Sequence, residues 1–323
     1  MSDELPTKLR AMRHFLAISD LDTETLRCLL DLCLQRKDEF RHGRLRPALQ
    51  NKVLAMIFQK PSLRTRLGFE AAMVQLGGHA INLEEHQIGL GQRENVRDVT
   101  RVLASMCDGI MARVFAHQLI VELAAHSSKP VINGLSDWSH PCQALADLMT
   151  IRERFGQLAG RKLAYIGDGN NVARSLLHAC VRSGLHFAIA APPGYALDAG
   201  TIEAGQVEAD RQGVTILQTQ DPREAADHAD VVYTDVWTSM GQEAESTARE
   251  QAFAGYQVNA ALMECARPTA IVMHCLPAHR NVEITDEVLD GPQSIVFEQA
   301  ENRLHSQRTL LELLLGRSPG STG

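Results

Sequence analysis

The chain has 323 residues, of which 45% are apolar and 22% are charged, and its formal net charge is −7. This length is more than one hydrophobic core comfortably serves, so we expect two domains, and the composition is ordinary for a soluble globular protein. The negative balance argues against general binding to nucleic acid or to an anionic membrane, so an anionic ligand would need a local basic pocket.

The cysteines and the N-terminus indicate the compartment. Seven cysteines are scattered along the chain without a CxxC pair, which favours free thiols in a reducing compartment over a disulfide framework. The first residues, Met1-Ser2-Asp3-Glu4, carry acid where a secretory signal has a basic and then an apolar stretch. No apolar run approaches the length of a membrane span. We therefore predict a cytoplasmic protein.

Apolar runs and helical patterns alternate along the chain in two series. The first series predicts strands at 52–58, 79–84, 109–114 and 129–133, with helices at 62–76, 94–106 and 117–126. The second series, after Gly160, predicts strands at 162–167, 186–190, 214–218, 231–236, 269–275 and 294–297, with helices at 171–183, 198–212, 223–229 and 258–265. A helix at 140–155 joins the two series, and another at 301–316 follows the second.

This alternation is typical of right-handed βαβ units on mainly parallel sheets. The predicted fold class is therefore α/β, with two doubly wound domains joined by a long connecting helix and a C-terminal helix that returns to the first domain. The predicted boundaries are 1–140, 141–156 for the connecting helix, 157–298, 299–316 for the C-terminal helix and 317–323 for a disordered tail. Such a fold predicts a ligand cleft where the C-terminal ends of both sheets face each other.

The helix start after the first strand has the composition of an anion site. The apolar run 53–58 leads into Pro61-Ser62-Leu63-Arg64-Thr65-Arg66 and then into a helical pattern. Free N–H groups and the helix dipole favour an anion there, and a guanidinium fork with short hydroxyl donors suits phosphate. The alternative is an ordinary helix start with solvated arginines. The segment lacks the Gly-rich Lys-Ser/Thr pattern of a nucleotide triphosphate site.

Further polar residues follow the other predicted strands or open helices. His140 and Gln143 share one helix face by their spacing. Each group has a structural alternative, such as a surface salt bridge for Arg113 or a backbone partner for His140. Random surface polarity does not collect at strand ends, so we interpret them as an α/β active site. The groups are Arg113, 139–143, 167–171, 235–241, 274–280 and 301–305.

The residue spacing does not match that of a zinc site or of a dinucleotide-binding site. His274, Cys275 and His279 lack a second cysteine pair or an acidic partner at zinc-like spacing, so we predict no metal. Gly167-x-Gly169 follows a strand as in dinucleotide sites, but the third glycine position holds Val172. We therefore predict no cofactor and no dehydrogenase.

Taken in order, these motifs resemble those of the ornithine carbamoyltransferases over about residues 8–316. They are Ser-x-Arg-Thr-Arg from Ser62, His-Pro-x-Gln from His140, Gly-Asp-Gly-Asn-Asn from Gly167, Asp-x-x-x-Ser-Met-Gly from Asp235, His-Cys-Leu-Pro from His274 and Glu-Asn-Arg from Glu301. The first two are shared by carbamoyltransferases generally. The segment 235–241 together with Cys275 points to ornithine, because aspartate-specific relatives have other residues there.

The resemblance implies that carbamoyl phosphate and L-ornithine give L-citrulline and phosphate. It assigns 1–140 to carbamoyl phosphate and 157–298 to ornithine. Donors around the carbamoyl oxygen would stabilise the oxyanion that forms when nitrogen attacks the carbonyl. For the phosphate, the resemblance implies Ser62, Arg64, Thr65, Arg303 and the backbone N–H of Leu63. For the carbamoyl oxygen, it implies Arg113, His140 and Thr65. For the carbamoyl NH₂, it implies Gln143 and the main-chain carbonyls of Cys275 and Leu276.

On the ornithine side, the resemblance assigns Asn171 to the α-carboxylate region and Asp235, Ser239 and Met240 to the amino groups. The δ-amine has a lysine-like pKa near ~10.4 and cannot attack while protonated. A neighbouring carboxylate raises that pKa further, whereas excluding water disfavours the charged amine. Asp235 and Cys275 are both candidate proton acceptors, and the sequence does not decide between them.

The resemblance also implies a homotrimer in which Gln87 serves the neighbouring subunit's site. Two alternatives stay open. One is a carbamoyltransferase for another amine or amino acid, such as putrescine or N-acetylornithine. The other is a non-catalytic relative that binds carbamoyl phosphate or a partner protein, although a scaffold needs none of the residues named above.

Overall fold

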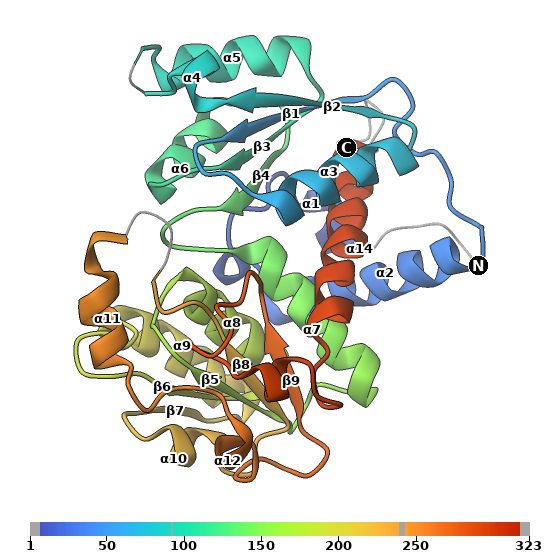
Figure 1. Cartoon of the computed structure of the whole chain (residues 1–323). Helices are drawn as coiled ribbons and strands as arrows, with labels where there is room; N and C mark the ends of the chain where they lie inside the picture. Colours follow the sequence, from blue (N-terminus) through green and yellow to red (C-terminus); the bar gives the residue numbers. More distant parts are fainter. Residues whose placement is uncertain (1–6, 92, 239–242, 317–323) are drawn as a thin grey trace. The chain divides into compact units, whose positions relative to one another are not determined.

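The structure, a computed structural model, describes residues 7–91, 93–238 and 243–316 (Figure 1). The predicted tail, 317–323, lies outside these residues. The chain forms two compact units: unit 1 is Met1–Met149 with Asn302–Gly323, and unit 2 is Thr150–Glu301. The division falls within two helices, α7 (Pro141–Phe155) and α14 (Val296–Leu315).

Unit 1 contains a parallel sheet of four strands in the order β2-β1-β3-β4. The strands are β1 (Val53–Phe58), β2 (His79–Glu84), β3 (Gly109–Arg113) and β4 (Val131–Leu135). The chain runs from β1 outward to β2 and then crosses back to β3 on the other side of β1. The C-terminal ends of β1 and β3 therefore lie at the topological switch point, where open α/β sheets bind their ligands.

Helices cover both faces of this sheet (Figure 1). On one face, buried strand residues such as Ile57, Ile110 and Ala112 form one apolar core with α5 and α6. The helices and the 3₁₀ turn assigned wholly to unit 1 are α1 (Thr7–Ala11), η1 (Ile18–Asp20), α2 (Thr23–Arg41), α3 (Leu63–Gln75), α4 (Glu85–Ile88), α5 (Val96–Met106) and α6 (His117–His126).

Unit 2 contains a parallel sheet of five strands in the order β7-β6-β5-β8-β9. Its switch point lies between β5 and β8, so the segments after Ile166 and Thr234 begin side by side. The strands are β5 (Lys162–Ile166), β6 (His186–Ala190), β7 (Ile216–Thr219), β8 (Val231–Thr234) and β9 (Ile271–His274).

One core cluster of unit 2 lies between strand residues such as Ala164 and Val232 and the aromatic side chains of Trp237, Phe253 and Tyr256. Trp237 stacks on Phe253 with ring centroids 5.6 Å apart. The helices and the 3₁₀ turn are α8 (Asn171–Arg182), α9 (Ala199–Gln212), α10 (Pro222–Ala226), η2 (Glu243–Glu245), α11 (Ser246–Ala252), α12 (Ala260–Met263) and α13 (Asp286–Leu289).

The α/β class and the two parallel sheets are confirmed, but the predicted strand at 294–297 is wrong. Ser294 makes a single bridge to Val272, and helix α14 begins two residues later at Val296. The apolar run Ile295-Val296-Phe297 resembles a strand, yet only Ile295 donates to the sheet, at Val272 O. The sequence indicates a helix that carries Cys28 and Cys33 on an apolar face but does not give its bounds; in the structure this helix is α2, and its N-cap Asp22 accepts from Thr25 N.

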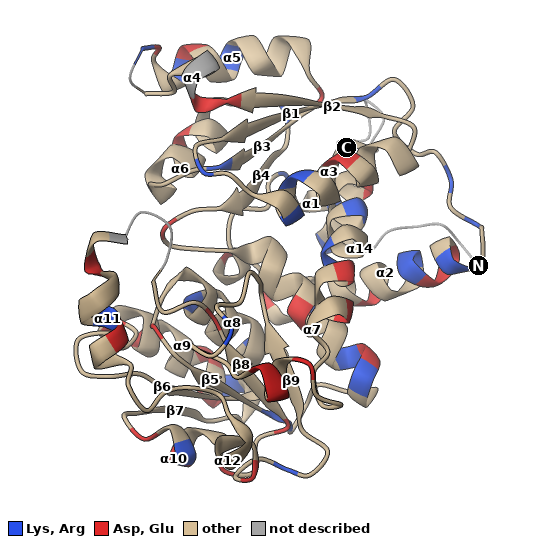
Figure 2. Cartoon of the chain, in the orientation of Figure 1, with Lys and Arg blue, Asp and Glu red and all other residues tan. Residues whose placement is uncertain are grey.

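Charge is spread over both units. Figure 2 shows basic and acidic positions interspersed along the helices rather than gathered on one of them. All seven cysteines are free thiols, as predicted. Among the described residues, none of the helices combines the length and the hydropathy that crossing a membrane requires.

Candidate functional site

The start of α3 carries the predicted phosphate residues. Ser62 is the N-cap, and its Oγ accepts from the backbone N of Thr65 at 3.3 Å. The Leu63 side chain is 74% exposed, so this residue offers a ligand its backbone N–H rather than its side chain. Thr65 is fully buried, and its Oγ1 accepts from Arg303 Nη2 at 2.7 Å. The first turn of α3 is thus tied to the part of α14 that belongs to unit 1.

Three guanidinium groups surround one buried histidine in unit 1. Burial lowers the pKa of His140 well below its ordinary value, and the positive charges of Arg303, Arg113 and Arg64 lower it further. These residues come from α3, the end of β3, the residue before α7, and α14. His140 is therefore a neutral imidazole at pH 7, able to donate one hydrogen bond without adding charge. This group of four residues is called the arginine cluster below.

Gln143 lies in the first turn of α7, three residues after His140 of the arginine cluster. Its Nε2 donates to Asp147 Oδ1 at 2.9 Å, and both residues are buried. This bond determines the orientation of the Gln143 amide, because the Asp147 carboxylate can accept a hydrogen bond from the amide nitrogen but not from the amide oxygen. Gln143 Oε1 is buried and has no hydrogen-bond partner among the described residues. The amide is oriented to accept from a ligand, and the sequence analysis did not identify Asp147 as the residue that orients it.

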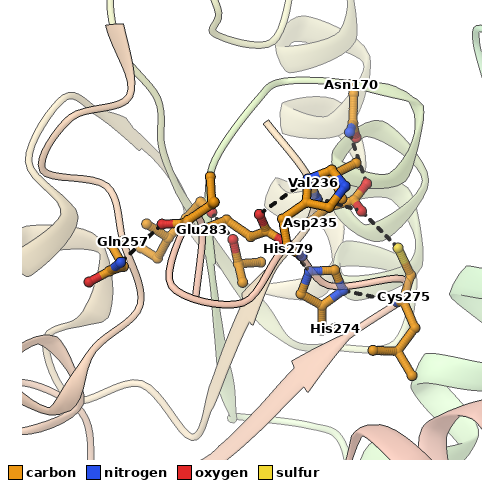
Figure 3. A network of polar contacts seen from close by, with 12 residues as sticks. Asn170, Asp235, Val236, Gln257, His274, Cys275, His279 and Glu283 are labelled. Atoms are coloured by element: carbon orange, nitrogen blue, oxygen red, sulfur yellow. Dashed lines mark hydrogen bonds and ion pairs between the residues drawn. The ribbon is translucent and has the colours of Figure 1, made fainter. Parts of the chain in front are cut away.

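In unit 2, Asp235 directly follows β8 at the switch point and is held by three donors (Figure 3). Its Oδ1 accepts from Val236 N at 2.8 Å and from the Cys275 thiol at 2.9 Å. Its Oδ2 accepts from Asn170 Nδ2 at 3.0 Å. Both carboxylate oxygens are therefore in hydrogen bonds, which fix the orientation of the Asp235 side chain.

The Asp235–Cys275 contact bears on the two candidate proton acceptors. With Asp235 ionised, the short contact requires the sulfur to keep its proton, because a thiolate 2.9 Å from a carboxylate oxygen would place two negative charges together. The geometry therefore favours a thiol that donates over a thiolate that accepts.

The sequence analysis placed Asn170 in the site segment 167–171 but assigned a ligand only to Asn171. Asn170 Oδ1 caps α8 by accepting from Val172 N and Ala173 N, while Asn170 Nδ2 holds Asp235. The signal was available, because Asn is a preferred N-cap residue before a helical pattern. Asn171 lies at the first position of α8 and is half-buried.

Three predicted site residues cannot be placed. Ser239 and Met240 lie outside the described residues, and the side chain of Gln87 is not described. The segment that leads to Ser239 is nevertheless held by a residue that the sequence analysis missed. Arg249 of α11 donates to Trp237 O at 3.0 Å and to Asp168 Oδ2 at 2.9 Å.

The cofactor alternatives can be tested against the geometry. Asp235, His274 and Cys275 offer ligand atoms within 4.8 Å of one another, so the structure supplies an acidic neighbour that spacing did not predict. Both ring nitrogens of His274 are already in hydrogen bonds, to Leu276 N and Glu283 Oε1. A metal would have to break one of these bonds. Gly169 is explained by packing, since a Cβ there would lie 2.5 Å from the backbone of Ala196.

Comparison with known proteins identifies the family. Residues 13–153 match the model of the aspartate/ornithine carbamoyltransferase carbamoyl-P binding domain, and residues 159–314 match that of the Asp/Orn binding domain. The chain belongs to the aspartate/ornithine carbamoyltransferase family. Within this carbamoyltransferase chain, Arg64, Arg113 and His140 fall in the first match, and Asp235 and Cys275 in the second.

Individual relatives match over nearly their whole length. Ornithine carbamoyltransferase of Symbiobacterium thermophilum is 50% identical over 303 residues, which are 94% of this chain and 98% of the relative. That of Bacillus subtilis is 48% identical over 309 residues, 96% of each chain. The solved ornithine carbamoyltransferase from Pyrococcus furiosus superposes with a TM-score of 0.92 at 47% identity, covering 95% of this chain and 98% of that one.

Proposed function

We propose that the chain transfers the carbamoyl group of carbamoyl phosphate to the δ-amine of L-ornithine, giving L-citrulline and phosphate. The observation that carries this proposal is the arginine cluster, in which three guanidinium groups surround a neutral buried histidine. Full-length similarity to ornithine carbamoyltransferases at about half identity supports the choice of reaction and of ornithine. We also propose that the protein works in the cytoplasm.

The carbamoyl phosphate half of the reaction fits unit 1. Arg64 and Arg303 supply positive charge for the phosphate dianion, with Ser62 and the backbone N–H of Leu63 at the start of α3. Arg113, neutral His140 and Thr65 would donate to the carbamoyl oxygen as it gains negative charge. Gln143 Oε1, fixed by Asp147, would accept from the carbamoyl NH₂. Gln143 Oε1 is an acceptor, so it does not suit the phosphate group, whose oxygens are also acceptors.

The ornithine half fits unit 2, where Asp235 presents a held carboxylate to an ammonium group. Asn171, Ser239 and Met240 complete the ornithine assignment by resemblance, and Cys275 and Leu276 add main-chain carbonyls for the carbamoyl NH₂. The neutral δ-amine attacks the carbonyl carbon, a C–N bond forms, and the C–O bond to phosphate breaks. The proton released by the attacking nitrogen can pass to the departing phosphate, which becomes more basic as that bond breaks.

The proton taken from the ammonium group before attack is assigned to Asp235 rather than Cys275, because the thiol already donates to the carboxylate. Cys275→Ser tests this, since a hydroxyl still donates but, unlike a thiol, does not ionise near neutral pH. We expect kcat to stay within about threefold and to keep its rise with pH, because the bond is retained. A loss of that pH dependence together with most of kcat would identify the thiol as the acceptor.

The reaction itself is tested by measuring citrulline and phosphate formation from carbamoyl phosphate. Ornithine, putrescine, N-acetylornithine and aspartate are offered in parallel at equal concentrations. Preference for ornithine supports the proposal, and preference for another amine replaces the substrate but keeps the reaction class. Binding of carbamoyl phosphate by calorimetry with no product from any amine would indicate the non-catalytic alternative.

The assembly is part of the proposal. We propose a homotrimer in which Gln87 of one subunit serves the site of its neighbour. Sedimentation measures the mass, and mixing Arg64→Ala protein with Gln87→Ala protein measures sharing. Activity that reappears only in the mixture would support a shared site, because some mixed sites then contain neither substitution.

A further inference from the structure

Two buried polar residues of unit 2 have no role in the reaction as proposed above. His274 ends β9, and Glu283 lies nine residues later; neither side chain is exposed. His274 Nε2 lies 3.0 Å from Glu283 Oε1 (Figure 3). A carboxyl group in a fully buried position is costly unless its partners hold it, so the pair calls for an explanation.

The contacts of His274 define its tautomer. Its Nδ1 lies 2.9 Å from the backbone N of Leu276, which can only donate. Nδ1 must therefore be the unprotonated nitrogen, and Nε2 must carry the hydrogen that points to Glu283. His274 is thus neutral in this geometry, because an imidazolium ring has no acceptor to offer Leu276.

Glu283 connects the two ends of the loop that follows β9. Its Oε1 accepts from His274 Nε2 and also from the backbone N of His279 at 2.6 Å. One carboxylate oxygen therefore holds both the first and the last residue of 274–279. Glu283 is itself fixed, since its backbone O accepts from Val258 N at 2.9 Å.

The loop needs such support because Leu276 has an unusual backbone. Its φ is +55°, in the left-handed region that side chains other than Gly, Asn and Asp rarely adopt. The hydrogen bond from Leu276 N to His274 lies in this turn. Between the two residues is Cys275, whose thiol reaches Asp235.

We propose that His274 and Glu283 are positioning residues, which hold Cys275 and Leu276 in the conformation that the ornithine-side site requires. His274 acts through its Nδ1 as an acceptor for Leu276 N–H, and Glu283 keeps the ring in the required tautomer and orientation. The loop geometry stands on the contacts above, whereas the consequence for catalysis rests on the proposed function.

The tautomer is tested on the unmodified protein. Long-range ¹H–¹⁵N correlation of the histidine rings between pH 6 and 8 distinguishes protonated from unprotonated ring nitrogens, and the His274→Gln spectrum assigns the signals. We expect the neutral ring of His274 to carry its hydrogen on Nε2 and not on Nδ1. A protonated Nδ1 would overturn the proposal, because Leu276 N–H would then have no acceptor.

The positioning effect is tested by the reactivity of Cys275. Its rate of alkylation by iodoacetamide is measured by peptide mapping in three variants. His274→Gln keeps a donor for Glu283 but loses the acceptor for Leu276, whereas His274→Asn places an oxygen near the Nδ1 position. We expect alkylation about tenfold faster in His274→Gln and nearly unchanged in His274→Asn. His279→Asn is the control, since its exposed ring is removed while its backbone N–H stays.

Equal rates in the Asn and Gln variants would overturn the proposal, since the acceptor at Nδ1 would then have no effect. Activity gives a further readout: kcat for citrulline formation should fall about tenfold in His274→Gln while the affinity for inorganic phosphate, a ligand of unit 1, stays the same. In one outcome, the unmodified protein forms no citrulline while the tautomer and alkylation results are as expected. That outcome would reject the proposed function but leave the positioning role of His274 and Glu283 intact.

Discussion

The switch points of the two sheets have the same topology but opposite electrostatics. In unit 1, the residues after β1 and β3 belong to a site built from donors, where Arg64, Arg113 and Arg303 surround His140. In unit 2, the residues after β5 and β8 build a site around an acceptor, where Asn170 and Cys275 both donate to Asp235. One doubly wound layout is therefore suited to an anion in one unit and to a cation in the other.

In each unit, neighbouring residues hold a polar side chain in a defined state. Burial and three positive charges keep His140 uncharged, whereas three donors fix the orientation of the Asp235 carboxylate. Hydrogen-bond donors and charges that are fixed in advance need no rearrangement when charge develops in a reaction.

The largest effect is expected when the acceptor of unit 2 loses its charge. Asp235→Asn should lower kcat/KM for ornithine on the order of 10²–10³-fold, because removing one partner of a buried charge pair costs about 3–5 kcal/mol. Affinity for inorganic phosphate, measured by calorimetry, should not change. The control is Asp221→Asn, at an exposed helix N-cap. A collapse of phosphate binding in Asp235→Asn would refute the division of labour between the units.

A smaller loss is expected when one donor of unit 1 is removed. Arg64→Ala should weaken carbamoyl phosphate binding about 10- to 100-fold, since a hydrogen bond to a charged group contributes about 1.5–3 kcal/mol. Arg66→Ala is a matched control from the same helical turn, because Arg66 pairs with Glu70 at the surface. Calorimetry with carbamoyl phosphate should separate the two variants. Equal affinities would mean that the cluster does not bind the anion.

The same contrast explains how far sequence alone could go. Hydrophobic periodicity predicted all nine described strands to within about two residues, because buried parallel strands read as continuous apolar runs. Arg64, Arg113 and His140 were found because they lie at the end of a strand or the start of a helix, which the order of elements along the chain predicts. Arg303 was found through its motif, since it lies inside α14. The strand predicted at 294–297 failed because three apolar residues look the same at the start of a buried helix.

The residues to which the sequence analysis gave no role act through other residues. Asp147 contacts Gln143, Glu283 contacts His274, and Asn170 contacts Asp235. In the sequence, Glu283 and Asp147 look like any exposed acidic residue of a loop or a helix. Nothing in their spacing indicates that they are buried. Pairing across the sheet, as between Asn170 and Asp235, depends on strand order, which periodicity does not give.

A smaller effect again is expected from Asp147, which acts on the ligand through Gln143. Asp147→Asn offers Gln143 both a donor and an acceptor, so the amide is no longer held in one orientation. Affinity for carbamoyl phosphate should fall about two- to tenfold, the effect of one neutral hydrogen bond. Inorganic phosphate has no NH₂ group, so its affinity should stay the same and serves as the control. Equal weakening for both ligands would show that Asp147 supports the fold rather than the orientation of Gln143.

The smallest effect on catalysis is expected from a second buried histidine, His178 of α8. Burial, assisted by Arg182 and Arg174, lowers its pKa from 6.5 to about 4. Between these values the unfolded chain binds a proton that the folded chain does not, so stability falls as the pH is lowered from 6.5 toward 4. His178→Asn should remove up to about 1.4 kcal/mol per pH unit from that slope, the value for one proton.

Urea unfolding at several pH values, with and without inorganic phosphate, measures this slope. Phosphate should stabilise the unmodified and His178→Asn proteins equally, because the arginine cluster and not His178 meets the anion. The mutant should also retain kcat for citrulline. If the slope is the same in both proteins, folded His178 already takes up a proton near pH 6.5, and burial does not control its charge as it does that of His140.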